Sequence, residues 1–463
     1  MASHRVLSAL ANPPAKMILM RVAILGTGYV GLTTGVCLSY LGHEVTCVDT
    51  DATKIDLLKS GKPPIYERGL EELLGRVDIT FSVDPGEAVS QAEIVFVAVG
   101  TPPQADGSPD LRYLRSAAHS ISQFLGDHFT VVVNKSTVPI GSGNWVESLV
   151  RKSQPAGRFA VASNPEFLRE GSALADSFYP DRIVIGADSS EARQMLEALY
   201  EPIIQQSFAP PPLLPRPDGL VTVPIVSSDL ASAELIKYAA NAFLALKISF
   251  INEIGNLAER VGADVREVAR GIGLDSRIGS KFLQAGIGWG GSCFGKDTAA
   301  LIATAAEYGL GMPIVSAARD INQRQRIRVI EKLLAELKVL KGRRIALLGL
   351  AFKPFTDDLR EAPAIDIARR LAQHGCSVAA HDPVAMDRFR REFPNEDVTL
   401  ADSAEEALQG ADATVLVTEW PEYLNLDWDG LKPSMRTPLV VDGRNFLDSA
   451  RLRSAGLRVV SIP

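Results

Sequence analysis

Short apolar runs alternate with helix-like segments along the first part of the chain. The runs at 21–25, 92–100 and 129–137 have β character and each leads into a turn, and residues 43–49 form a similar run. Residues 30–42 show helical periodicity instead and end at a glycine. Strands that alternate with helices predict a parallel sheet with helices on both faces.

The pattern changes after a proline-rich stretch at 209–219. Residues 228–261 contain no proline and a single glycine, and Gly262 follows them. They predict one helix of about 30 residues, which is unusually long for a globular domain. Such a helix could connect two domains and provide a dimer surface. Helical character continues to about residue 335 and is interrupted by the glycine-rich stretch 286–297.

The last part of the chain repeats the first in outline. The segments 343–353, 375–383 and 410–420 resemble the first strand and turn, the second strand and the strand at 92–100. The echo predicts a second doubly wound domain, and its lack of a G-x-G-x-x-G spacing predicts that it binds something other than a dinucleotide pyrophosphate.

The expected fold is therefore α/β, with two doubly wound Rossmann-like domains joined by a helical central domain that contains one long helix. The predicted parts are a disordered extension at 1–16, a first doubly wound domain at 17–218, the central helical domain at 219–335 and a second doubly wound domain at 336–463.

Composition and charge restrict the possible partners. The 463 residues are 46% hydrophobic and 22% charged, as in an ordinary globular protein, and the net charge is −7. The acidic balance argues against nucleic acid or an anionic membrane as the main partner. No apolar run reaches the roughly 18 residues of a membrane span. Four widely spaced cysteines suggest a reducing cytoplasm without disulfides, and six histidines without metal-ligand spacing suggest no metal site.

The turn after the first strand has the spacing of a dinucleotide-binding loop. In Gly26-Thr-Gly28-Tyr-Val-Gly31, the first glycine would make the tight turn, the second would admit a pyrophosphate and the third would let helix pack on strand. Asp49 ends the next strand 18 residues later. A carboxylate there accepts hydrogen bonds from ribose hydroxyls and repels a 2′-phosphate, so NAD is favoured over NADP. The alternative is a glycine turn with no ligand.

One cysteine has unusual surroundings. Cys37, Cys47 and Cys376 are expected to be buried small side chains, the common state of a free cysteine. Cys293 should instead be exposed, because the glycines around it leave little for the thiol to pack against. A thiolate can add to an aldehyde, and hydride loss from the adduct gives a thioester, which suggests covalent redox chemistry. The surrounding glycines are Gly288, Gly290, Gly291 and Gly295.

Lys237 and Asn241 lie four residues apart on the predicted long helix and therefore share a face. A lysine and an amide that face a pocket could stabilise an alkoxide or an oxyanion. A solvated lysine and a surface asparagine explain the spacing equally well.

Six motifs together resemble the UDP-glucose 6-dehydrogenase branch of the nucleotide-sugar dehydrogenases. The similarity runs in order from about residue 20 to the C-terminus. The resemblance implies a four-electron oxidation of UDP-glucose to UDP-glucuronate with two NAD. The motifs are NKSTVP (134–139), SNPEFLREG (163–171), KYAAN (237–241), GGSCFGKD (290–297), GLAFKPFTDDLRE (349–361) and DGRN (442–445).

The resemblance also implies roles for individual residues. The reacting groups would be Cys293 as nucleophile, Lys237 and Asn241 for the oxyanion, Asp297 and Thr137 for a water, and Glu166 as acid and base. The NAD site would contain Gly26, Gly28, Tyr29, Val30, Gly31, Asp49, Lys54, Thr101, Ser136, Glu170 and Arg360. The UDP-sugar site would contain Phe167, Leu168, Arg169, Glu170, Lys237, Asn241, Arg277, Phe282, Gly290, Phe352, Lys353 and Arg444.

In such a family Arg277 reaches the substrate of the neighbouring subunit, so a homodimer or a higher homo-oligomer is implied. The second doubly wound domain would bind the UDP end. Three alternatives stay open: a dehydrogenase of GDP-mannose or of a UDP-N-acetylhexosamine, a two-electron hydroxyacid dehydrogenase, and a protein that binds nucleotide sugars without turnover.

Overall fold

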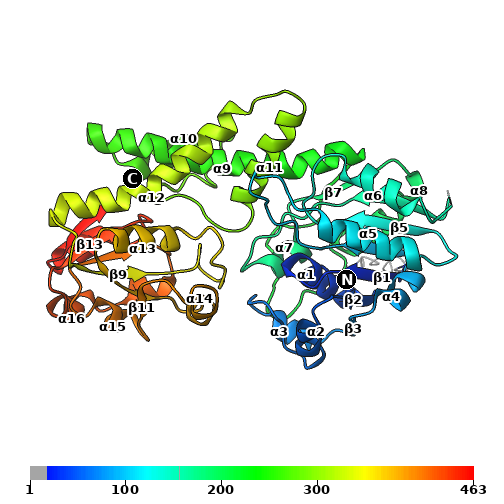
Figure 1. Cartoon of the computed structure of the whole chain (residues 1–463), viewed down its shortest axis with the longest axis horizontal. Helices are drawn as coiled ribbons and strands as arrows, with labels where there is room; N and C mark the ends of the chain where they lie inside the picture. The colour runs from blue at the N-terminus through cyan, green and yellow to red at the C-terminus, as the bar shows by residue number, and fades with distance from the viewer. Residues whose placement is uncertain (1–17, 156) are drawn as a thin grey trace, which may run out of the picture.

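The computed structural model describes residues 18–155 and 157–463, so the extension predicted at 1–16 lies outside the described residues. Two α/β bodies stand apart, and a layer of long helices runs over both of them (Figure 1). This arrangement confirms the predicted fold class of two doubly wound domains joined by a helical domain.

The first body contains an eight-stranded sheet in the order β3-β2-β1-β4-β5-β6-β7-β8. The order 3-2-1-4-5-6 is that of a dinucleotide-binding domain. Strands such as β4 are buried along their whole length, which is why they have no polar alternation. The strands are β1 Arg21–Leu25, β2 Glu44–Val48, β3 Ile79–Ser82, β4 Ile94–Val97, β5 Thr130–Asn134, β6 Phe159–Ser163, β7 Ile183–Ala187 and β8 Ile225–Ser228.

Two features of this sheet differ from the sequence prediction. Strand β7 pairs antiparallel with β6, although a wholly parallel sheet was expected. Strand β8 pairs with β7, so the sheet continues beyond residue 218, where the first domain was predicted to end. The helices of this body are α1 Tyr29–Tyr40, α2 Ala52–Lys59, α3 Leu70–Leu74, α4 Pro85–Gln91, α5 Arg112–Phe124, α6 Ser142–Val150, α7 Ala173–Phe178 and α8 Ser190–Ile204.

The predicted long helix is α9, Leu230–Val261, with 32 residues. It begins where the side chain of Asp229 accepts a hydrogen bond from the amide of Ser232 at 2.8 Å, and it ends at Gly262, whose φ of 76° is left-handed. Helix α9 packs against α10 Val265–Gly273, α11 Phe294–Glu307 and α12 Pro313–Leu337. It also contacts β6 and β7, so it is fixed to the first body.

The second body contains a six-stranded parallel sheet in the order β11-β10-β9-β12-β13-β14. This order repeats the 3-2-1-4-5-6 arrangement and confirms the predicted similarity between the first and last parts of the chain. The strands are β9 Arg344–Leu348, β10 Ser377–His381, β11 Val398–Leu400, β12 Ala413–Leu416, β13 Leu439–Asp442 and β14 Arg458–Ser461. The helices are α13 Pro363–Gln373, α14 Met386–Glu392, α15 Ala404–Leu408, α16 Trp428–Leu431 and α17 Ser449–Ser454, with short 3-10 turns η1 Pro421–Asn425 and η2 Lys432–Ser434.

Two glycine-to-alanine changes should have opposite effects on stability. Gly262→Ala should destabilise the chain by about 1 kcal/mol, because an alanine is strained in the left-handed conformation that ends α9. Gly271→Ala, inside α10 with open space around the position, should be neutral or stabilising by up to roughly 1 kcal/mol. Thermal unfolding measures both, and a loss of stability of equal size in the two variants would contradict this explanation of the helix end.

Candidate active site

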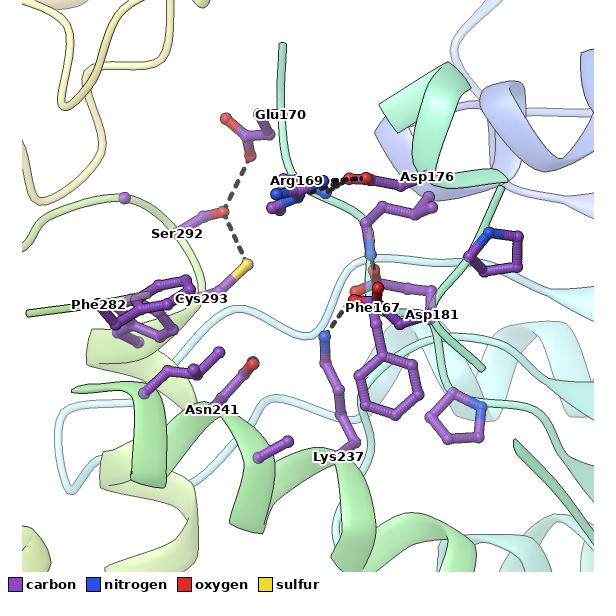
Figure 2. Close-up of a pocket in the computed structure, with 18 of the residues that line it drawn as sticks. Phe167, Arg169, Glu170, Asp176, Asp181, Lys237, Asn241, Phe282, Ser292 and Cys293 are labelled. Atoms are coloured by element: carbon purple, nitrogen blue, oxygen red, sulfur yellow. Dashed lines mark hydrogen bonds and ion pairs between the residues drawn. The ribbon is translucent and has the colours of Figure 1, made fainter. Parts of the chain in front are cut away.

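A cavity of about 830 Å³ lies where the two bodies and the helical layer meet. Its walls include segments that are distant in sequence, among them the loop after β6, helix α9, the glycine-rich stretch that leads into α11 and loops of the second body. Figure 2 shows Lys237 and Asn241 of α9, and Arg169 and Glu170 of the loop after β6, around the thiol of Cys293. The structure therefore assembles one site from motifs that are up to several hundred residues apart.

Lys237 and Glu166 form a buried ion pair in this wall. Lys237 Nζ donates to Glu166 Oε1 at 3.1 Å, and their side chains are only 4% and 8% exposed. The other oxygen of Glu166 accepts from the amide of Leu168 at 2.5 Å. Burial lowers the pKa of Lys237, but the negative charges around it, Glu166 first, outweigh burial and leave the pKa above its usual value. Lys237 is therefore an ammonium group, and the alternative of a solvated lysine is wrong.

Asn241 lies one turn further along α9 and also lines the cavity. Its amide donates to Asp297 Oδ2 at 2.6 Å, while Lys296 holds the other oxygen of Asp297 at 2.6 Å. Asp297 is buried behind Asn241 and is not part of the cavity wall. Thr137 does not line the cavity either, and its backbone carbonyl accepts the hydroxyl of Thr101 at 2.9 Å. The structure thus does not bring Thr137 and Asp297 together at the cavity.

Cys293 caps the start of α11 and lines the cavity. The other three cysteines are buried, as expected, whereas Cys293 is partly buried and not freely exposed. Burial raises the pKa of its thiol, and the Lys237 ammonium opposes that effect. The resting group is therefore a thiol that needs a base, or a nearby positive charge, before it can attack.

The glycines near Cys293 serve a different purpose from the one predicted. A side chain at Gly290 would come within 2.5 Å of the carbonyl of Glu361, and one at Gly291 would come within 2.6 Å of the Phe352 ring. At Gly295 the nearest atom would be 3.5 Å away, an ordinary contact. The glycines mainly let this loop pack closely on the second body. The sequence could not show this because the contacting residues come from another domain.

Two buried polar groups near the site were not predicted. Glu67 accepts the amides of Gly171 and Ala173 at 2.7 and 2.8 Å and so holds the end of the loop that carries Glu166. Burial raises the pKa of Glu67 to about 6, although these amides oppose the effect. Lys135 lines the cavity and donates to Asn164 at 2.9 Å. Its position in NKSTVP was the only sequence signal for it.

Burial lowers the pKa of Lys135 to about 8, even though the nearby Glu166 carboxylate favours its charged form. The amide nitrogen of Asn164 donates in turn to the carbonyl of Val184 at 2.7 Å. The start of the loop is thus tied to the sheet, while Glu67 holds its end.

The glycine-rich turn after β1 has the geometry of a dinucleotide site. Gly26 has a φ of 105°, and a side chain at Gly31 would lie 1.9 Å from the carbonyl of Gly26, so only glycine allows α1 to start this close to the strand. Nothing lies within 4 Å of a side chain placed at Gly28. That open space is where a pyrophosphate could approach the backbone and the N-terminus of α1.

Asp49 follows β2 at the same edge of the sheet. It accepts the amide and hydroxyl of Thr27 at 2.9 and 2.7 Å and the amide of Asp51 at 3.0 Å. Burial raises the pKa of this carboxyl, but these hydrogen bonds and Lys54, 3.8 Å away, outweigh burial and hold the pKa below its usual value. Asp49 is an ionised group with free lone pairs, which suits ribose hydroxyls.

The remaining predicted cofactor residues gather at the strand ends nearby. The hydroxyl of Ser136 donates to the carbonyl of Val99 at 2.6 Å, and that of Tyr29 donates to the carbonyl of Tyr66 at 2.6 Å. Arg360, from the second body, donates to Glu170 Oε1 at 3.1 Å and so links the second body to the loop after β6. The other predicted positions here are Val30, which packs on the core, and Thr101, which is buried.

The second body has the same topology, but its equivalent acid cannot hold a ribose. Asp382 follows β10 as Asp49 follows β2, yet it is fully buried. Its oxygens accept the indole of Trp420 at 3.1 Å and the amides of Leu350 and Val384 at 2.7 and 2.9 Å, with two further amides. This saturated carboxylate explains physically why the second body does not repeat the dinucleotide site.

Most of the predicted UDP-sugar residues line the cavity. Arg182 and Lys237 both lie close to the Phe167 ring, at 3.5 and 5.3 Å from the ring centre. Arg444 donates to the carbonyl of Gly288 at 2.8 Å. Arg277 does not line the cavity: its side chain is 87% exposed and pairs with Asp275 at 2.6 Å. The predicted residues in the wall are Phe167, Leu168, Arg169, Glu170, Lys237, Asn241, Phe282, Gly290, Phe352, Lys353 and Arg444.

A dinucleotide-type fold whose cleft holds a cysteine, an ammonium group and a carboxylate defines a nucleotide-dependent dehydrogenase. The chain belongs to the UDP-glucose/GDP-mannose dehydrogenase family. The family's NAD binding domain matches residues 20–204, its central domain 231–324 and its UDP binding domain 346–449. NAD is accordingly the cofactor. No helix among the described residues is long and apolar enough to cross a bilayer.

Individual relatives extend over nearly the whole chain. The chain is 44% identical to a UDP-glucose 6-dehydrogenase of Bacillus subtilis, covering 94% of this chain and 91% of that protein. It is 45% identical to a UDP-glucose 6-dehydrogenase of Rhizobium meliloti, covering 96% and 99%. A solved UDP-glucose dehydrogenase of Pyrobaculum islandicum superposes with a TM-score of 0.86 at 40% identity, covering 96% and 98%.

Asp49→Asn should weaken NAD binding by roughly tenfold, because a neutral amide is a poorer acceptor for ribose hydroxyls than a carboxylate. The preference for NAD over NADP should fall at the same time, since the charge that repels a 2′-phosphate is gone. Calorimetric titration with NAD and NADP measures both effects, and affinity for UDP-glucose is the internal control. Unchanged NAD affinity would show that Asp49 does not contact the ribose.

Proposed function

We propose that this protein oxidises UDP-glucose to UDP-glucuronate with two NAD, through an intermediate bound covalently to Cys293. The observation that carries the proposal is the placement of the Cys293 thiol in one cavity with the Lys237 ammonium and Asn241. An alcohol-to-aldehyde oxidation alone needs no thiol, whereas an aldehyde-to-acid oxidation gains a thioester route from it.

The identities favour glucose over other sugars. The chain is 44% and 45% identical to the two UDP-glucose 6-dehydrogenases, and 27% identical to a UDP-D-ManNAc dehydrogenase of Pyrococcus horikoshii that has a similar fold, with a TM-score of 0.80. Substrate choice within the family therefore follows the UDP-glucose branch.

The turn after β1 fits NAD on three structural grounds. The space at Gly28 is open, the close contact at Gly31 fixes the start of α1, and Asp49 is ionised with acceptor capacity to spare. NAD, when bound, accepts the hydride that leaves the sugar carbon. Glu170 and Arg360 join the two bodies beside this turn and would shield the reacting groups from water.

In the first oxidation the C6 hydroxyl of the sugar loses a proton and a hydride to give an aldehyde. Lys237 and Asn241 point into the cavity from one face of α9 and would stabilise the oxygen as negative charge develops on it. Glu166 keeps Lys237 in its charged form and fixes its position. Glu166 is also the carboxylate that could accept a proton through Lys237.

In the second oxidation the Cys293 thiolate adds to the aldehyde carbon. The resulting thiohemiacetal loses a hydride and becomes a thioester, which water then hydrolyses to the carboxylate and the free thiol. The same lysine and asparagine serve both tetrahedral oxyanions, because both form on the same carbon. Asp297 lies behind Asn241 and would act by positioning that amide, since it is not in the cavity wall. We expect the loops of the second body, with Phe352, Lys353 and Arg444, to bind the UDP end.

We further propose that the protein acts as a homodimer in the cytoplasm. Phe243, Phe250, Leu257 and Val261 recur every seven and four residues along α9, so they share one face, and all four side chains are exposed in the single chain. A second copy of this face would cover them. Arg277 does not line its own cavity, and its exposed side chain is available to a neighbouring subunit.

Cys293→Ala should abolish formation of UDP-glucuronate, lowering turnover by about a thousandfold or more, because no thioester can form. NAD and UDP-glucose should still bind. Product analysis by chromatography and calorimetric titration check the two parts. Cys376→Ala is the matched control, since Cys376 is buried in the second body against the carbonyl of Leu340 and should leave turnover unchanged. Full activity of Cys293→Ala would refute the covalent route.

A comparison of nucleotide sugars tests the substrate. UDP-glucose should have a kcat/KM at least about a hundredfold above those of GDP-mannose and UDP-N-acetylhexosamines, because an added acetamido group or a different base changes several contacts at once. Preferred turnover of one of the other nucleotide sugars would leave the proposed reaction intact but show that UDP-glucose is not the substrate. Binding of UDP-glucose without any turnover would show a binding protein instead.

A further inference from the structure

The hydroxyl of Ser292 lies between Cys293 and Glu170. Ser292 Oγ is 3.6 Å from Cys293 Sγ and donates to Glu170 Oε1 at 3.2 Å (Figure 2). A serine hydroxyl has a single hydrogen. When that hydrogen goes to Glu170, only the thiol can supply the hydrogen in the contact between sulfur and oxygen. The three groups therefore form a chain with one direction, from the thiol through the hydroxyl to the carboxylate.

At both ends of this chain the surroundings raise the pKa above its usual value. Burial, with the neighbouring Asp358, raises the pKa of Glu170 to about 8, although the positive charges of Arg360 and Lys353 oppose the shift. Burial also raises the pKa of the Cys293 thiol. Proton transfer is most effective when the pKa of the base lies close to that of the group it deprotonates and to the working pH. An ordinary carboxylate would be far too weak a base for a thiol.

Other carboxylates near the sulfur are already engaged. Glu166 and Asp297 face Cys293 and raise the pKa of its thiol, while Lys237 lowers it. Glu166 is paired with Lys237, and Asp297 is held by Asn241 and Lys296. Neither has a hydrogen bond to the sulfur.

Glu170 is also paired, because its Oε1 accepts from Arg360 at 3.1 Å, but unlike the other two it is linked to the sulfur through Ser292. Its second oxygen, Oε2, is buried and has no hydrogen-bond partner among the described residues. Glu170 is therefore the carboxylate to which the thiol proton has a path.

We propose that Glu170 accepts the proton of Cys293 through the hydroxyl of Ser292, which makes Ser292 a positioning and relay residue for thiolate formation. The S–H bond breaks and its proton bonds to Ser292 Oγ, while the Ser292 proton moves to Glu170 Oε1. The sulfur keeps the electron pair, and no group is oxidised or reduced. This inference rests on the proposed function only in taking Cys293 as the nucleophile.

The test is the rate at which iodoacetamide alkylates Cys293 in the full-length protein, with no NAD or sugar present, as a function of pH. Mass spectrometry follows the peptide that contains Cys293, and the three other cysteines are buried. The wild-type rate should rise with pH through about 8, where Glu170 becomes a carboxylate. Ser292→Ala should slow alkylation by about tenfold at pH 8, and Ser292→Thr, which keeps the hydroxyl, should restore most of the rate.

Glu170→Gln separates the relay from simple electrostatics. Removal of a nearby negative charge by itself makes a thiol more acidic and speeds its alkylation. The relay predicts the opposite, a slower reaction that lacks the rise near pH 8. A faster or unchanged rate in Glu170→Gln, or an unchanged rate in Ser292→Ala, would overturn the proposal. The readout needs no turnover, so a relay that persists in a protein inactive on UDP-glucose would refute the proposed substrate alone.

Discussion

The site depends on one buried ion pair, between Lys237 on α9 and Glu166 in the loop after β6. The two charges are almost fully removed from water, so loss of either partner would leave an uncompensated charge, at a cost of about 3–5 kcal/mol. The pair joins helix α9 to the loop after β6, which continues to Glu170. Glu170 in turn accepts a hydrogen bond from Arg360 of the second body. This ion pair thus fixes the position of Lys237 and holds the loop whose Glu170 contacts the second body.

Much of the fold could be predicted because its signals are local. Strand β1, the glycine turn and the end of α9 at Gly262 follow from periodicity and from what glycine alone allows. The antiparallel β7 and the late β8 could not be predicted, since pairing between strands depends on contacts distant in sequence. The same limit hid Glu67, whose partner Gly171 is 104 residues away. For the same reason the expectation of an exposed Cys293 was wrong. The residues that pack against the neighbouring glycines come from the second body, and Cys293 is partly buried.

The two bodies show how one topology can serve different purposes. Both sheets contain the order 3-2-1-4-5-6, and in both an aspartate directly follows the second strand. Asp49 keeps acceptor capacity free, whereas the oxygens of Asp382 are saturated by backbone amides and by Trp420. Hydrogen-bond satisfaction, and not the fold, decides which body can receive a ribose. The second body instead contributes Phe352, Lys353 and Arg444 to the shared cavity.

The central claim is that one thiol carries an alcohol through two successive oxidations in this single cavity. The most direct measurement is the yield of NADH, followed by its absorbance, when limiting UDP-glucose reacts to completion with excess NAD. The account predicts two NADH for each UDP-glucose, with UDP-glucuronate as the product. One NADH for each sugar, with an aldehyde or a ketone as the product, would contradict the role assigned to Cys293.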